Sequence, residues 1–157
     1  MGRTLPTPRF RDHAAMLLAG TLRSYAAADG PKLVPMQWGD FFALDVPGIH
    51  AAEVTYGVVM RATADAMDYM CAIEVPDFDG VHADVHRETL AAAHCAVFTI
   101  DGLAHIQQNW ADIYMTWMPT SGYRPTAAPA YERYDARFDA ETNSGPVELW
   151  IAVERVG

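Results

Sequence analysis

The chain has 157 residues, of which 51% are hydrophobic and 20% charged, and its formal net charge is −9. This length and composition predict a single folded domain, and the acidic charge argues against direct contact with nucleic acid. No apolar segment is long enough to cross a bilayer and no signal peptide is recognisable, so we expect no membrane partner and a cytoplasmic location.

The first half of the chain predicts a strand, a helix and two further strands. Gly20 interrupts the first apolar segment, which favours a strand over a helix there, and a turn over Asp29–Pro31 follows it. We expect Pro35 to limit the start of the helix and residues 45–48 to end it. The predicted elements are a strand over Arg11–Tyr25, a helix over Lys32–Leu44, and strands over Glu53–Ala62 and Asp68–Val75.

The second half predicts the same order after an acidic loop over Pro76–Asp84. A short strand over Arg87–Ala91 comes before the repeated elements. A turn-rich connection over Pro119–Pro129 separates the helix of this half from its last two strands. The predicted elements are a strand over Ala93–Ile100, a helix over Leu103–Trp117, and strands over Ala130–Phe138 and Val147–Val156.

The two predicted helices carry the same apolar stripe. Val34, Trp38, Phe41 and Phe42 recur 72 positions later as Ile106, Trp110, Ile113 and Tyr114. Each set follows one helix face, and the matching order of elements indicates an internal duplication, with pseudo-repeats at about 10–76 and 93–156 of a single domain over 1–157. We therefore predict an α+β fold: a duplicated strand-helix-strand-strand repeat, a curved and mostly antiparallel sheet, two main helices and a central ligand cleft.

Strand alternation divides the residues between two faces of this sheet. We assign the aliphatic positions to the core under the helices; they are Cys71, Ile73, Val75, Leu149, Ile151 and Val153. The positions between them include Met70, Glu74, Glu148 and Trp150, and we expect Glu132 and Tyr134 of the preceding strand to lie beside the last two. Aromatic rings mixed with carboxylates suit a flat, apolar, cationic ligand. The alternative is an ordinary exposed face with scattered large side chains.

Other chemistry has weaker support. His82 and His86 are four residues apart but fall in a predicted loop without a clear third ligand, so we expect no metal and no cofactor. His94 and Cys95 are adjacent on a strand, which points them to opposite faces and prevents a nucleophile–base pair. Cys71 and Cys95 fit buried free thiols of a reducing compartment, and a disulfide between them is the alternative.

Several segments resemble the GyrI-like small-molecule-binding family, which also supplies effector-binding domains of AraC-type and MerR-type bacterial transcription regulators. The resemblance covers nearly the whole chain, from about Pro8 onward. Its segments are AMLLAG (15–20), YGVVM (56–60), YMCAIEVP (69–76), AVFTIDG (96–102), SGYRP (121–125), YERYDARFD (131–139) and VELWIAV (147–153).

The resemblance implies a central cleft that binds aromatic, often cationic, drug-like compounds. It places the family's acids of the last two strands at Glu132 and Glu148, and aromatic pocket positions at Tyr134 and Trp150. Where the family often has Tyr and His before the second helix, this chain has Cys95 and Ile100. From both halves we expect these ligand-binding residues: Glu148, Trp150, Glu132, Tyr134, Tyr56, Met70 and Glu74. We expect Trp38 and Trp110 to anchor the helices to the sheet rather than contact ligand.

The favoured function is that of a small-molecule effector sensor or sequestration protein, without catalytic residues. The chain begins almost directly at its first strand, which leaves no room for a helix-turn-helix. We therefore expect a free-standing ligand-binding domain, or else a piece of a longer regulator that pairs with a DNA-binding domain.

Two other functions stay open. The family resemblance also implies hydrolysis of reactive genotoxic small molecules, in which a cleft carboxylate with a raised pKa would be general acid or base, Glu148 first and Glu132 second. It implies as well a protein that acts on gyrase as a partner.

Overall fold

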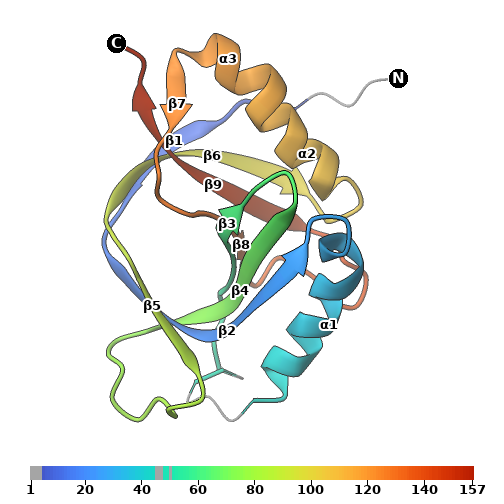
Figure 1. The fold of residues 1–157 in the computed structure, drawn as a ribbon, viewed down its shortest axis with the longest axis vertical. Coiled ribbons are helices and arrows are strands. Elements are labelled where there is room, and N and C mark those ends of the chain that lie inside the picture. Colours follow the sequence, from blue (N-terminus) through green and yellow to red (C-terminus); the bar gives the residue numbers. More distant parts are fainter. Residues whose placement is uncertain (1–4, 45–47, 50) are drawn as a thin grey trace.

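The computed structural model describes residues 5–44, 48–49 and 51–157. Within this part of the chain the strands form one strongly curved antiparallel sheet in the order β1-β6-β9-β8-β3-β4-β2-β5, and β7 pairs with β9. The helices lie on one side of the sheet, and the bends at which β1 continues into β2 and β5 into β6 curl away from them (Figure 1). The elements are β1 (Arg9–His13), β2 (Met16–Ala26), α1 (Gly30–Phe42), β3 (Thr55–Ala62), β4 (Ala66–Val75), β5 (His86–Leu90), β6 (Ala93–Asp101), α2 (Ile106–Asp112), the π-helical turn η1 (Ile113–Trp117), α3 (Met118–Ser121), β7 (Tyr123–Pro125), β8 (Ala130–Tyr134) and β9 (Pro146–Arg155).

The predicted fold class is confirmed. The order strand-helix-strand-strand occurs as β2-α1-β3-β4 and again as β6-α2-β8-β9. The short strands β1, β5 and β7 are additions to this repeat. No helix in the described ranges is both long and apolar enough to span a membrane.

The ends of several elements differ from the prediction. α1 begins at Gly30, so the expectation that Pro35 limits its start is wrong: Pro31 occupies the first turn, and Pro35 lies inside the helix. Pro31 suits the first turn because its ring presets the helical φ angle, whereas Pro35 removes only one backbone hydrogen bond. Residues 45–47, which we expected to end this helix, lie outside the described residues.

In the second half the predicted helix is divided into α2 and η1, which ends at Trp117, and the helical region continues past this predicted end through α3. The last strand but one ends at Tyr134 instead of Phe138, because the Asp135 carboxylate accepts the backbone N–H of Arg137 (2.9 Å) and turns the chain.

Two further strand pairings join the N-terminal strands to the strands that begin the second half. β1 pairs with β6 from Arg9↔Val97 to His13↔Ala93, and β2 pairs with β5 from Met16↔Leu90 to Gly20↔His86. The pairing of β2 with β5 therefore continues, in the same register, the pairing of β1 with β6. The sheet therefore has an outer face, covered by the helices, and an inner face that packs against itself.

Both faces carry a hydrophobic core. The outer core lies under α1, around Phe41 and Ile73, and under α2, around Ile113 and Leu149. The aliphatic positions are thus on the helix-covered face, as predicted. The inner core joins residues of five strands and is made of Met16, Leu18, Tyr56, Val58, Met70, Ala72, Leu90 and Tyr131. Cys71 and Cys95 are both buried free thiols, so the alternative of a disulfide between them is wrong.

A buried amide fixes α1 to the outer face. Gln37 is fully buried, and its Nε2 donates to the backbone oxygens of Thr21 and Tyr69, each at 3.0 Å. Its Oε1 accepts a hydrogen bond from the Tyr25 hydroxyl at 2.8 Å. Since a buried polar group without a partner is costly, this amide specifies how the helix sits on β2 and β4.

Replacing this amide should therefore destabilise the protein. We expect Gln37→Ala to lower the free energy of unfolding by roughly 2–3 kcal/mol, because it leaves backbone oxygens and a phenol without partners. Urea unfolding followed by tryptophan fluorescence measures the change. Gln107→Ala, which removes an exposed amide from α2, is the control and should change stability by less than about 0.5 kcal/mol. Equal effects of the two would contradict the anchoring role.

Candidate functional site

Glu132 lies on the outer face of the sheet, not beside Glu148. The register of β8 against β9 pairs Tyr131 with Trp150, Glu132 with Leu149, and Arg133 with Glu148. Directly paired residues of antiparallel strands share a face. The expectation that Glu132 and Tyr134 lie on the same face as Glu148 and Trp150 is therefore wrong, because a register that differs by one residue exchanges the faces of the whole strand.

On the outer face Glu132 is held by a group of neutral aromatic donors. The hydroxyls of Tyr69 and Tyr134 both donate to Glu132 Oε1 at 2.7 Å, and the Trp110 indole donates to Oε2 at 3.3 Å. The Trp38 indole donates in turn to the Tyr69 hydroxyl at 3.2 Å. We call these five residues the Glu132 cluster. It joins β4 and β8 of the sheet to α1 and α2.

The cluster gives Glu132 hydrogen bonds but no opposite charge. Glu132 is only 7% exposed, and none of the ion pairs among the described residues includes it. Burial raises its pKa, and the hydrogen bonds from Tyr134, Tyr69 and Trp110 offset this only in part. The site therefore stabilises a positive charge brought to it, or a proton.

The tryptophans do more than anchor the helices. Trp38 packs edge-on against the Tyr134 ring, with centroids 5.6 Å apart, and stacks on Phe42. Trp110 stacks on Tyr114 of the same helical region. Both indoles are half-buried. Trp110 links α2 directly to Glu132, and Trp38 links α1 to Glu132 through the Tyr69 hydroxyl.

Tyr69, Trp38 and Trp110 are the members of the Glu132 cluster that sequence reasoning did not place at the site. The sequence contained one signal for the tryptophans, which occupy the same position in the two repeats. Tyr69 carried no such signal. Strand alternation puts it on the same face as Cys71 and Ile73, which was assigned to the core, and not on the face of Met70, where the ligand was expected.

Gly57 makes room for the central hydrogen bond. It pairs with Glu132 on β8 and with Cys71 on β4. A Cβ atom at this position would lie 1.9 Å from the Tyr69 hydroxyl oxygen and 2.7 Å from Glu132 Oε1. Only glycine therefore lets the Tyr69 side chain cross β3 to reach the carboxylate.

Glu148 is in the opposite electrostatic situation. It is 5% exposed and lies against three guanidinium groups, those of Arg9 (2.5 Å), Arg133 (3.4 Å) and Arg137 (3.7 Å). The Trp150 indole also donates to it at 3.0 Å. Its charge is already compensated, which makes Glu148 a poor counter-ion for a cationic ligand.

The other predicted ligand residues lie on the inner face, apart from the Glu132 cluster. Trp150 stacks on Tyr131 with centroids 5.5 Å apart, and Met70 is fully buried in the inner core. Tyr56 and Glu74 lie on the same face, near its end. The structure thus divides the predicted site into an outer part with Glu132 and Tyr134, and an inner part with the rest.

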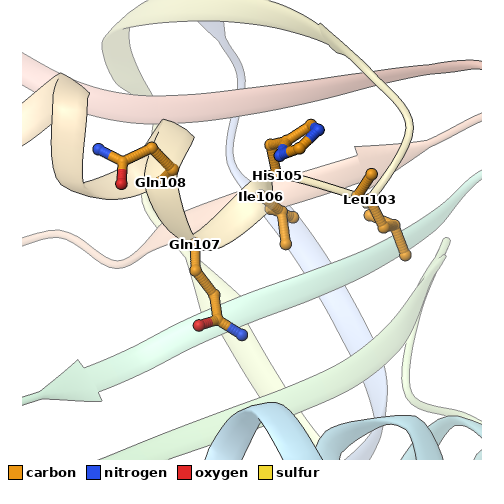
Figure 2. Close-up of a pocket in the computed structure, with 6 residues that line it drawn as sticks. Leu103, His105, Ile106, Gln107 and Gln108 are labelled. Atoms are coloured by element: carbon orange, nitrogen blue, oxygen red, sulfur yellow. The ribbon is translucent and has the colours of Figure 1, made fainter. Parts of the chain in front are cut away.

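A hollow of about 350 Å³ lies at the start of α2 (Figure 2). It is lined by consecutive residues, and the amides of Gln107 and Gln108 point in different directions from the helix. No member of the Glu132 cluster lines it. We assign the candidate site to the cluster because it brings a nearly buried carboxylate together with aromatic side chains of both halves.

Comparison with known proteins agrees with the sequence resemblance. The family model described as the GyrI-like small molecule binding domain matches residues 6–154. The chain belongs to this family. Among curated proteins, this GyrI-like chain is 29% identical over 111 residues to the transcriptional regulator BrlR of Pseudomonas aeruginosa. That match covers 69% of the chain and 41% of the regulator, so the chain spans less than half of the relative's length.

Two solved structures show the same fold as this GyrI-like domain. SAV2435, solved bound to tetraphenylphosphonium, superimposes with a TM-score of 0.71 at 20% identity and covers 94% of this chain and 93% of its own. The EcmrR C-terminal domain superimposes with a TM-score of 0.68 at 15% identity and covers 98% of this chain and 100% of its own.

Filling the space at Gly57 should disturb the Glu132 cluster. We expect Gly57→Ala to cost about 1–3 kcal/mol of stability, because the added methyl group collides with the Tyr69 hydroxyl. Gly39→Ala is the matched control: a Cβ atom there meets nothing within 4 Å, and alanine favours the helix by about 0.5–1 kcal/mol. Chemical denaturation of both variants measures the two effects, which should have opposite signs. Equal stability of Gly57→Ala and the parent would contradict the crowding.

The raised pKa of Glu132 should appear in the pH dependence of stability. Above the ordinary glutamate pKa of 4.5, the folded state still holds a proton that the unfolded state has lost, so the free energy of unfolding falls as the pH rises toward the folded pKa. Glu132→Gln removes this titration. We expect the parent to lose stability relative to this variant over that interval, in urea unfolding measured from about pH 4 to about pH 8. A difference that stays constant over the range would contradict the raised pKa.

Proposed function

We propose that this GyrI-like domain binds lipophilic aromatic cations between its two main helices, with Glu132 as the counter-ion. The observation that carries the proposal is a nearly buried carboxylate that accepts three hydrogen bonds from neutral donors and, within the described residues, takes part in no ion pair. A buried charge of this kind is unfavourable until an opposite charge reaches it.

The surroundings of Glu132 fit the apolar part of such a ligand. Trp38 and Trp110 are the aromatic members of the cluster that come from the helices. Phe42 and Tyr114, each 40% exposed, stack on them and continue the aromatic surface toward solvent. Aromatic faces attract organic cations through their quadrupoles, by about 0.5–2 kcal/mol for each contact. The ligand must displace part of this aromatic cover, and the long bond from Trp110 to Glu132 (3.3 Å) is the weakest tie in it.

The relatives support the same class of ligand and a regulatory role. SAV2435 was solved with tetraphenylphosphonium, an aromatic cation, and BrlR is a transcriptional regulator. We infer that the domain acts as an effector sensor or by sequestering its ligand. If the domain were joined to a DNA-binding domain, ligand binding here would make transcription depend on the ligand concentration.

Tetraphenylphosphonium is the first probe. We expect saturable quenching of tryptophan fluorescence. The dissociation constant should be at least about tenfold weaker in Glu132→Gln, since this variant loses the charge attraction between the buried carboxylate and the cation, and close charge pairs couple by about 1.5–7 kcal/mol. Glu141→Gln, which removes an exposed carboxylate from the turn before β9, is the control and should bind like the parent. Neutral triphenylphosphine oxide should bind the parent and Glu132→Gln equally weakly. Equal affinity of the parent and Glu132→Gln for the cation would overturn the role of Glu132.

Hydrolysis is the second candidate, and the raised pKa of Glu132 is the observation that favours it. A carboxyl group with a pKa nearer neutrality can exchange protons with a bound substrate. The residue for this role is then Glu132 and not Glu148, whose charge is held by arginines. Chromatography of a reactive electrophilic probe after incubation separates the two functions: conversion that stops in Glu132→Gln supports hydrolysis, and an unchanged probe supports binding alone.

A further inference from the structure

A second cavity opens at the end of the inner face, on the other side of the sheet from Glu132. Its volume is about 330 Å³, and it is lined by Ala52, Glu53, Val54, Tyr56, Glu74 and Arg133. Liquid water fills about 30 Å³ per molecule, so the cavity holds on the order of ten water-sized atoms. These residues come from β3, β4, β8 and the segment before β3, which are well separated in the sequence.

Tyr56 supplies a polar group at the bottom of this cavity. The residue is only 6% exposed, and its ring packs edge-on against Tyr131. The residue lines the cavity, and its hydroxyl lies close enough to the Arg133 side chain to interact with it. Burial raises the pKa of Tyr56, against the opposing effect of Arg133, so the phenol keeps its proton and can donate it in a hydrogen bond.

Charges of both signs surround the hydroxyl. Arg133 uses Nη1 for Asp135 and Glu148, each at 3.4 Å, and its side chain also interacts with the Tyr56 hydroxyl. Glu53 and Glu74 are exposed acids on the rim, and neither is part of an ion pair in the described ranges. A guanidinium fork recognises a carboxylate with two parallel hydrogen bonds, and the two acids attract an ammonium group.

From this arrangement we propose that the inner-face cavity is a second binding site, for a small zwitterion that carries a carboxylate and a primary ammonium group. The carboxylate accepts hydrogen bonds from Arg133 and the Tyr56 hydroxyl, and the ammonium group lies between Glu53 and Glu74. A ligand with only one of these charges leaves part of the site uncompensated. The site does not depend on cation binding at Glu132.

The two sites lie back to back on the same strands. On β8, Arg133 points to the inner cavity and Glu132 to the outer cluster; on β3, Tyr56 lines the cavity and Gly57 lies beneath the bond from Tyr69 to Glu132. Both sites are therefore formed by adjacent residues of the paired strands β3 and β8, and the two sites lie on opposite faces of the sheet.

The test uses three probes of similar length: 5-aminopentanoate, pentylamine and pentanoate. Titration of each is followed by backbone amide chemical shifts in two-dimensional NMR spectra. We expect saturable shifts at residues 52–56 and 133 for 5-aminopentanoate, and at least about tenfold weaker binding of the two singly charged probes. Tyr56→Phe and Glu74→Gln should each weaken 5-aminopentanoate by about tenfold. Glu154→Gln, an exposed acid at the end of β9, should bind it like the parent.

Glu132→Gln distinguishes this proposal from the one about the outer site. It should bind 5-aminopentanoate like the parent, even where tetraphenylphosphonium no longer binds. Shifts that fail to saturate, shifts at the Glu132 cluster instead of the cavity, or equal binding by the parent, Tyr56→Phe and Glu74→Gln would each overturn the inner-face site.

Discussion

The hydrogen bonds to Glu132 hold the two halves of this protein together at their centre. One carboxylate on β8 accepts bonds from Tyr69 of the first half and from Tyr134 and Trp110 of the second, while Trp38 reaches Tyr69 from α1. The indole of α2 thus donates to Glu132 itself, and the indole of α1 donates to the Tyr69 hydroxyl, which in turn donates to Glu132. The position of both helices, the glycine at residue 57 and the raised pKa of Glu132 are consequences of burying that carboxylate among neutral donors.

The comparison of Glu132 with Glu148 shows how neighbours decide the use of a buried acid. Both are almost inaccessible to solvent, and they lie on neighbouring strands. Glu148 is surrounded by guanidinium groups, so its charge stabilises the fold and ties the N-terminal strand to β9. Glu132 has only dipoles around it in the described part of the chain, so its charge is available to a partner.

Much of the architecture was predictable from the sequence, and the site was predictable only in part. The repeated helix stripe, the alternation in β4 and β9, and the turn residues were enough for the order of elements and for the face that the helices cover. The grouping of site residues depended on how β8 aligns with β9, and the loop between them leaves that alignment open. The sequence pattern YERY carries large side chains on both faces, so hydrophobicity did not select the register. Tyr69 and Gly57 belong to the site because of contacts between different strands, and the local sequence pattern cannot predict such contacts.

The long-range pairings of the first two strands also govern how the chain can fold. Among the described residues β1 pairs with β6 alone, and β2 pairs with β5 as well as with β4. A first half synthesised alone would expose the β5-facing edge of β2 and the whole of β1. Contacts between residues so far apart in sequence carry a high entropic cost before they form, and this slows folding. During synthesis on the ribosome β1 therefore has no strand to pair with until residues near Val97 have been made.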